Sequence, residues 1–361
     1  MKKFLPGLAL CLLAYPILAN AEMHFPILNG NPPVAVQQDS FENVYAQARA
    51  AYDDENYAKA AQLFRRALKI NPKSADAFYH LGSCYYELEL YLEAISAYQE
   101  AIRLKPDYYD AIIYLGNAYD YDGQFPKAVE MYRKAIQLRP NEWQPYYELG
   151  VAQYSRESYT EAISSFQESI RRDPKNYRSF YYTGKALVLL RKNNEAIKAF
   201  NEAIRLQPDS IDAHLNLGNL YVQMKEWQMA ILEYKQVLKY EEDNASAFLG
   251  LGNAYYNQGK FPESIDPYQN AVKVSPKWLT ANLYLADAYR MSKQFAEAVK
   301  SYQAAIRLDD ESDSAYFGLG MSYVGQNNAS AARQQYEKLR YLNPNLAAQL
   351  MSEITKLSLS A

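Results

Sequence analysis

The side chains that carry out most protein chemistry are scarce in this sequence. Cysteine occurs only at Cys11 and Cys84, and histidine only at His24, His80 and His214. Metal sites and Cys–His or Ser–His catalytic pairs need such groups in clusters, whereas these five are scattered along the chain. We therefore expect no metal site, no cofactor and no enzymatic activity.

Charge and glycine patterns argue against two further kinds of function. The 361-residue chain has 38 basic and 41 acidic residues, a formal net charge of -3, so it lacks the basic surface that nucleic acids and anionic membranes attract. Two Gly-Leu-Gly sequences, at 250–252 and 318–320, resemble parts of a phosphate-binding loop, but the third glycine of that loop is absent. A helix-packing period accounts for the second glycine of each.

Tyrosine is the residue type whose abundance needs an explanation. The chain has 35 tyrosines, against 13 phenylalanines and 3 tryptophans. A tyrosine ring supplies apolar contact area and its hydroxyl supplies a hydrogen bond, which suits a surface that binds another molecule. The chemistry that these residues support is non-covalent binding, and its geometry depends on the elements that carry them.

A period of 34 residues organises the sequence from residue 41 to residue 346. Leu-Gly pairs recur in this frame, as do an alanine followed four residues later by a ring and a proline that ends the block. The glycines expected to pack at helix contacts are Gly82, Gly116, Gly150, Gly184, Gly218, Gly252 and Gly320. The prolines are Pro72, Pro106, Pro140, Pro174, Pro208, Pro276 and Pro344.

Each block contains two apolar stripes at helical spacing. In one block they are Phe78, Leu81 and Tyr85, followed by Ala94 and Tyr98. Such stripes predict two amphipathic helices per block. The block-ending proline stops the second helix because it has no amide hydrogen and restricts the residue before it. One helix pair cannot bury both stripes alone, so neighbouring pairs must stack.

This pattern resembles the tetratricopeptide repeat, whose Leu-Gly, tyrosine, alanine, aromatic and proline signature it matches over residues 41–346. The resemblance implies an all-α fold, a right-handed superhelical solenoid of about nine helix-turn-helix repeats. It also implies that the first helix of each repeat lines a concave groove that binds peptides or proteins. Residues 347–361 keep one apolar stripe and are expected to form a C-terminal capping helix and tail.

Side chains at one place in successive repeats should form lines along such a groove. Tyrosine crowds the first five repeats three residues before and four residues after the repeat glycine, and asparagine recurs one residue after it. The predicted peptide-binding residues are Tyr45, Tyr52, Tyr79, Tyr86, Asn117, Tyr147, Tyr154, Tyr181, Asn219, Asn253 and Tyr256. The alternative is that half of the rings only pack between helices and that the asparagines bond only to water or local backbone.

The start of the chain has the pattern of an export signal. Residues 1–21 combine a short basic start, an apolar run and a small-x-small end, which predicts a cleavable signal peptide. Residues 22–40 contain turn formers and no helical period, so we expect a flexible leader. The mature chain is then exported, to the periplasm or as a secreted protein, and is not inserted in a membrane.

These observations predict a non-catalytic scaffold that binds an extended peptide or protein segment in a concave groove lined by tyrosine and asparagine. Two alternatives stay open. One is a structural component of an envelope assembly or polysaccharide-export machine, and the other is a glycan-binding protein. The expected partner is thus a protein or peptide, with a glycan as the second possibility and nucleic acid excluded.

Overall fold

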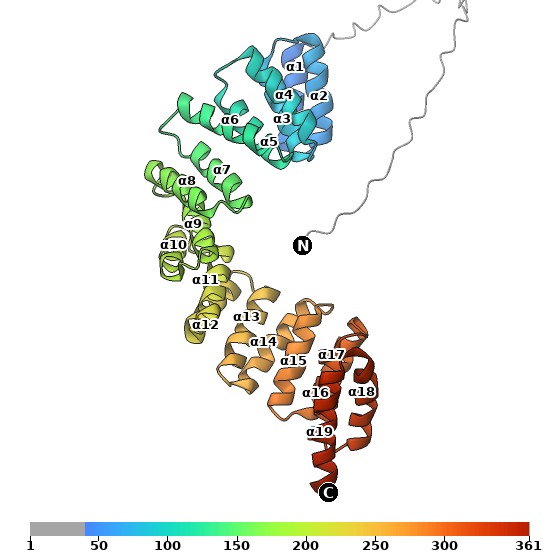
Figure 1. Ribbon diagram of the computed structural model, residues 1–361. Coiled ribbons are helices and arrows are strands. Elements are labelled where there is room, and N and C mark those ends of the chain that lie inside the picture. Colours follow the sequence, from blue (N-terminus) through green and yellow to red (C-terminus); the bar gives the residue numbers. More distant parts are fainter. Residues whose placement is uncertain (1–39, 361) are drawn as a thin grey trace, which may run out of the picture.

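The computed structural model describes residues 40–360, which form nineteen α-helices and no strand (Figure 1). The predicted signal peptide (1–21) and leader residues 22–39 lie outside the described residues, and so do Cys11 and His24. The helices are α1 Phe41–Asp53, α2 Tyr57–Ile70, α3 Ala75–Glu87, α4 Tyr91–Leu104, α5 Tyr109–Tyr121, α6 Phe125–Leu138, α7 Gln144–Ser155, α8 Tyr159–Arg172, α9 Tyr177–Leu189, α10 Asn193–Leu206, α11 Ile211–Gln223, α12 Trp227–Tyr240, α13 Ala245–Asn257, α14 Phe261–Val274, α15 Leu279–Met291, α16 Phe295–Leu308, α17 Asp313–Gly325, α18 Ala329–Leu342 and α19 Pro344–Ser360.

The helices form one elongated, curved stack with α1 at one end and α19 at the other (Figure 1). Each odd-numbered helix packs on the helix before it and the helix after it in the chain. Successive odd-numbered helices, such as α5 and α7, also contact each other, and within residues 40–360 no pair of successive even-numbered helices does so to the same extent. The odd-numbered helices therefore form the inner wall of the curve. The predicted helical repeat solenoid is confirmed.

A tight turn with one residue in the left-handed region joins the two helices of every repeat. These nine residues have φ between 57° and 82° and follow one another at 34-residue intervals. They are Glu55, Glu89, Gly123, Glu157, Arg191, Lys225, Gly259, Lys293 and Asn327. A left-handed residue after a helix lets the last carbonyls find partners and turns the chain back on itself. The same turn at every repeat fixes the angle between its two helices.

Contact between a glycine and a ring joins the two helices of a repeat. In the fourth repeat, Ala162 and Phe166 of α8 are fully buried, and a Cβ atom added at Gly150 of α7 would lie 2.5 Å from Phe166 Cε1. Any larger residue would push the ring away, so glycine is needed for close approach. The same arrangement, with added-Cβ distances of 2.5 to 2.9 Å, joins Gly82 to Tyr98, Gly116 to Tyr132, Gly184 to Phe200, Gly218 to Tyr234 and Gly252 to Tyr268.

The last helix covers the open end of the stack. Leu350 and Ile354 of α19 are fully buried against α17 and α18. Gly320 has a different neighbour from the other repeat glycines, because a Cβ added there would meet Leu350 of α19. Among the helices of residues 40–360, none combines the length and the hydropathy that a membrane crossing requires.

Candidate binding site

The tyrosines three residues before the repeat glycine are held inside the wall of odd-numbered helices. Each lies against the buried ring of the second helix of its own repeat, with ring centroids 5.6 to 6.1 Å apart. The pairs are Tyr45 with Phe64, Tyr79 with Tyr98, Tyr147 with Phe166 and Tyr181 with Phe200. Burial raises the pKa of all four hydroxyls. The main role of these rings is therefore to pack within the wall rather than to contact a ligand.

The tyrosines four residues after the repeat glycine are half-buried and contact the start of the second helix. Each meets edge-on the ring that begins the second helix of its repeat, at centroid distances of 5.0 to 5.8 Å. The pairs are Tyr52 with Tyr57, Tyr86 with Tyr91, Tyr154 with Tyr159 and Tyr256 with Phe261. Edge-to-face contact is a favoured geometry for aromatic pairs, so it fixes the orientation of each ring.

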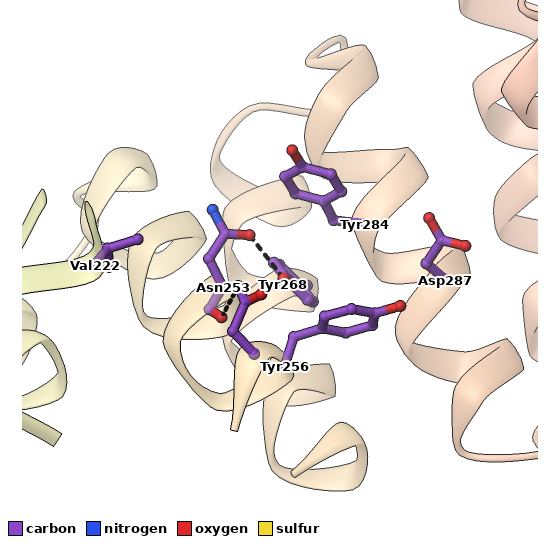
Figure 2. Close-up of a pocket in the computed structure, with 7 residues that line it drawn as sticks. Val222, Asn253, Tyr256, Tyr268, Tyr284 and Asp287 are labelled. Atoms are coloured by element: carbon purple, nitrogen blue, oxygen red, sulfur yellow. Dashed lines mark hydrogen bonds between the residues drawn. The ribbon is translucent and has the colours of Figure 1, made fainter. Parts of the chain in front are cut away.

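The predicted asparagines are tied to the second helix of their own repeats. The hydroxyls of Tyr132, Tyr234 and Tyr268 donate to the Oδ1 atoms of Asn117, Asn219 and Asn253, at 2.8, 2.7 and 2.7 Å. Figure 2 shows the bond between Tyr268 and Asn253. Because Oδ1 takes this proton, the amide has a fixed orientation and its Nδ2 group is available as a donor.

The same two places change together in most other repeats. In the second and eighth repeats the hydroxyls of Tyr98 and Tyr302 donate to Ser83 and Asp287, at 3.2 and 2.6 Å. In the fourth and fifth repeats the ring is phenylalanine and the residue after the repeat glycine has no side-chain acceptor for a hydroxyl. These pairs are Phe166 with Val151 and Phe200 with Lys185. The asparagine line is thus first a line of partly buried hydrogen bonds to the second helices.

Three pockets open on the wall of odd-numbered helices, and equivalent repeat positions line them. The α5–α7 pocket has a volume of about 320 Å³, the α9–α11 pocket about 170 Å³ and the α13–α15 pocket about 250 Å³. Most lining residues of each pocket and of the next one along the chain occupy the same repeat positions, shifted by two repeats. Figure 2 shows the last of them, with Asn253, Tyr256, Tyr268 and Tyr284 among its lining residues. The pockets include the predicted residues Tyr86, Asn117, Tyr154, Asn219, Asn253 and Tyr256.

A third aromatic position was missed by the sequence prediction. Two residues before the repeat glycine, a ring lies on the buried ring of the preceding repeat, with centroids 5.5 to 6.2 Å apart. The pairs are His80 with Phe64, Tyr114 with Tyr98, Tyr182 with Phe166 and Tyr284 with Tyr268. In two later repeats the place holds Gly250 and Gly318, which lie directly against the preceding rings. The first glycine of each Gly-Leu-Gly sequence is therefore also a packing glycine.

The α5–α7 pocket contains two carboxylates from neighbouring repeats. Burial raises the pKa of Asp120, and the nearby Arg156 opposes this increase. Burial also raises the pKa of Glu148, to about 7; the side chain of Gln144 and the charge of Arg178 oppose the shift, and the charge of Asp120 adds to it. The pair therefore carries negative charge in a place that disfavours it.

At the α9–α11 pocket, the side chain of Lys185 lies among three tyrosine rings. The Nζ atom of Lys185 lies 5.1, 5.4 and 5.2 Å from the ring centroids of Tyr154, Tyr181 and Tyr182. Aromatic faces attract cations at such distances. Three tyrosine rings of the wall therefore interact with an ammonium group that belongs to the chain itself.

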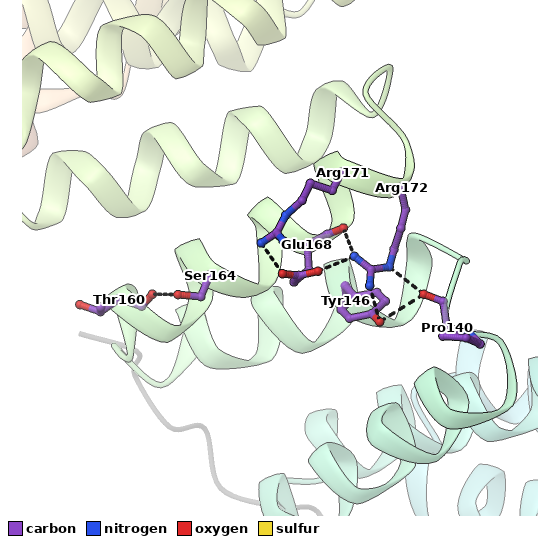
Figure 3. Close-up of polar contacts among 7 residues, drawn as sticks. All are labelled: Pro140, Tyr146, Thr160, Ser164, Glu168, Arg171 and Arg172. Carbon is purple, nitrogen blue, oxygen red and sulfur yellow. Dashed lines mark hydrogen bonds and ion pairs between the residues drawn. The ribbon is translucent and has the colours of Figure 1, made fainter.

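Polar contacts connect the segment between α6 and α7 to the two helices that follow it (Figure 3). Arg172 Nε donates to the Pro140 carbonyl at 2.8 Å, and its Nη2 donates to the Tyr146 hydroxyl at 2.7 Å. The guanidinium lies 3.8 Å above the Tyr146 ring, and Glu168 pairs with its Nη1. These contacts tie the end of the third repeat to both helices of the fourth.

Family comparisons agree with this architecture. A model described as tetratricopeptide repeat matches residues 45–109, 115–177, 250–313 and 283–347, and a second, described as TPR repeat, matches residues 184–225 and 218–259. The first alone covers more than half of the chain. The chain belongs to the tetratricopeptide repeat family.

Solved structures share the fold at low sequence identity. The C-terminal part of a TPR repeat-containing protein from Cytophaga hutchinsonii is 18% identical, with a TM-score of 0.50, over 76% of this chain and 99% of that one. PilF of Pseudomonas aeruginosa is 20% identical, with a TM-score of 0.51, over 59% of this chain and 97% of that one. No curated protein matches the sequence.

Proposed function

We propose that this chain is a non-catalytic scaffold that binds an extended polypeptide along its wall of odd-numbered helices, from α3 to α15. The tetratricopeptide fold suggests a protein interaction scaffold. The observation that carries the finer proposal is the recurrence of pockets at equivalent repeat positions, two repeats apart. A periodic wall suits a ligand that is itself linear and repeats its backbone at regular intervals.

The wall is organised before any ligand arrives. Asn117, Asn219 and Asn253 have their amides oriented by tyrosine hydroxyls, and Tyr86, Tyr154 and Tyr256 have their rings fixed edge-on. A preformed site loses little conformational entropy on binding. Each oriented Nδ2 group can donate to a ligand carbonyl, which contributes roughly 1 kcal/mol per hydrogen bond.

The test of this proposal uses substitutions that fill the pockets and leave the buried core unchanged. Ser155, Gln223 and Asn257 are exposed residues at one repeat position, five after the glycine, and each lines one pocket. Residues 22–361 are used to select random linear peptides displayed on phage, and the selected peptides are then measured against the variant S155W/Q223W/N257W. We expect its affinity to fall at least ~10-fold, because a bulky ring at each pocket excludes the ligand.

A matched control carries the same substitutions on the outer face. Ser164, Gln236 and Asn270 are exposed on α8, α12 and α14, and they repeat the Ser, Gln and Asn of the pocket variant. We expect S164W/Q236W/N270W to bind within about twofold of the unmodified chain. Equal losses in both variants, or a loss only in the outer one, would place binding elsewhere. A library that yields no binding peptide would reject polypeptide binding itself.

We also propose that the scaffold works outside the cytoplasm. The basic start, apolar run and small-x-small end of residues 1–21 support this proposal. N-terminal sequencing of the chain recovered from the envelope fraction of its host tests it. A chain that begins after Ala21 agrees with export, and a cytoplasmic chain that retains residues 1–21 contradicts it.

A further inference from the structure

The α5–α7 pocket differs from the other two pockets in its charge. It contains two acids, Asp120 and Glu148, whereas the α13–α15 pocket contains one, Asp287, and the α9–α11 pocket none. The repeat positions of these carboxylates hold Val188 and Asn216 at the α9–α11 pocket, and Tyr256 and Tyr284 at the α13–α15 pocket. Because the three pockets share one architecture, the two acids at a single pocket point to a local preference in what is bound there.

One oxygen of this acidic pair has no hydrogen-bond donor within the chain. The Oδ1 atom of Asp120 is buried and accepts no hydrogen bond. Arg156 also lines the pocket and forms an ion pair with Asp120, but its Nη2 lies 3.7 Å from Oδ1, beyond hydrogen-bond distance. Its guanidinium lies 5.2 Å from the ring centroid of Phe125. A buried acceptor without a donor is costly, so a donor from outside would be stabilised there.

The rest of the pocket is aromatic. Tyr86 and Tyr121 lie edge to face at 5.7 Å, and the nearly buried Tyr132 forms the floor with Asn117. At the α9–α11 pocket, a comparable group of tyrosine rings surrounds the ammonium of Lys185. No lysine of the chain is among the residues that line the α5–α7 pocket. The α9–α11 pocket thus has one cation and no acid among its lining residues, whereas the α5–α7 pocket has two acids and one cation, Arg156.

We propose that the α5–α7 pocket is the subsite for a basic side chain, lysine or arginine, of the bound polypeptide. This inference rests on the proposed function, since the basic group must belong to the extended ligand. The cation donates to Asp120 and Glu148, and its methylene groups lie on the rings of Tyr86 and Tyr121. The other two pockets have no such requirement, so the basic residue fixes the register of the ligand along the wall.

The test uses the peptides selected from the phage library on residues 22–361. Selection is repeated on D120N/E148Q, which keeps the shape of both side chains and removes their charge. The control E130Q/E161Q makes the same change in charge at two exposed acids of α6 and α8. We expect lysine or arginine to be enriched at one position for the unmodified chain and the control, and not enriched for D120N/E148Q.

A binding cycle then measures the contact itself. One selected peptide is synthesised with its basic residue and again with norleucine in its place, and both are titrated by fluorescence anisotropy. We expect norleucine to weaken binding about tenfold for the unmodified chain and less than twofold for D120N/E148Q. Circular dichroism of the variant checks that its helices are retained.

The outcomes separate this inference from the function on which it rests. Selected peptides without any basic preference, or a preference that D120N/E148Q retains, would overturn the basic subsite while peptide binding stands. Peptides that lose their basic preference but still bind D120N/E148Q support both. No selected peptide at all would overturn both together.

Discussion

The two halves of the stack build one repeat frame from different side chains. From α1 to α10 the inner wall is a network of rings, in which Tyr79 and Tyr181 lie on buried rings of their own repeats. In the sixth to eighth repeats the same position holds Leu215, Leu249 and Leu283, and in the ninth it holds Phe317. Both halves share the left-handed turns and the buried ring of the second helix. The fold therefore does not require tyrosine at this position, and in the first half these rings pack within the wall.

The largest effect should come from closing the space beside a buried ring. We expect Gly150→Ala to lower the free energy of unfolding by about 3 kcal/mol, because its Cβ would lie 2.5 Å from Phe166. Gly218→Ala, in the second half, should cost less, since its Cβ would lie 2.9 Å from Tyr234. Urea unfolding followed by circular dichroism measures both.

The matched control for this pair is Gly123→Ala. Gly123 has φ of 82° and would place its Cβ in open space, and seven other turns carry a non-glycine residue in that region. We expect a cost of about 1 kcal/mol or less. A cost at Gly150 no greater than at Gly123 would mean that contact between glycine and ring does not join the helices.

The second effect concerns Glu148 of the α5–α7 pocket, whose repeat position in the second half holds Tyr284. The native pKa of Glu148 is about 7, above the ordinary value of 4.5, so the folded chain binds its proton more tightly than the unfolded chain does. Stability attributable to Glu148 then falls as pH rises from about 4.5 to 7. We expect Glu148→Gln to raise the free energy of unfolding by about 2 kcal/mol at pH ~8 and to change it little at pH ~4.

Unfolding midpoints of both chains across that pH range provide the measurement. Glu161→Gln, on the exposed surface of α8, is the control and should give parallel curves. If Glu148→Gln also runs parallel to the unmodified chain, Glu148 does not carry a raised pKa in the folded state.

Much of the fold could be predicted because one pattern repeats without insertion. The period of Gly150 and its equivalents gives the helix pairs, and the order of apolar stripes gives the stack. The turns were less visible: only Gly123 and Gly259 mark them in the sequence, while the other seven left-handed residues are Glu, Arg, Lys or Asn. The backbone there is fixed by the helices on either side, which overrides the preference for glycine.

The site could be predicted only in part. A repeat position specifies the direction in which a side chain points, but it does not specify how deeply that side chain is buried. Tyr86 and Tyr154 line pockets, whereas Tyr147, predicted with them, is only 9% exposed. The acidic pair was not predicted, since Asp120 and Glu148 occupy different repeat positions and meet only when two repeats stack. Contacts between repeats depend on the stacking geometry, which a single-repeat pattern does not contain.

The third effect tests the hydrogen bonds beneath the asparagines. Tyr234→Phe removes the donor to Asn219 Oδ1 and should lower the free energy of unfolding by about 1 kcal/mol. The control is Tyr336→Phe, because that repeat has Met321 in place of asparagine, and we expect almost no change. Equal costs at Tyr234 and Tyr336 would show that the hydroxyl contributes through something other than the asparagine.

The smallest effect comes from transferring this bond into a repeat that lacks it. The fourth repeat has Phe166 in the second helix and Val151 after its glycine, where the third repeat has Tyr132 and Asn117. Each single variant, Val151→Asn or Phe166→Tyr, places a polar group without its intended partner and should be destabilising. In V151N/F166Y the two groups can pair, so the loss should be smaller than the sum of the single losses by about 0.5–1 kcal/mol. Urea unfolding of all four chains gives this coupling, and losses that simply add would mean that the paired changes of tyrosine and asparagine do not reflect a transferable contact between the helices.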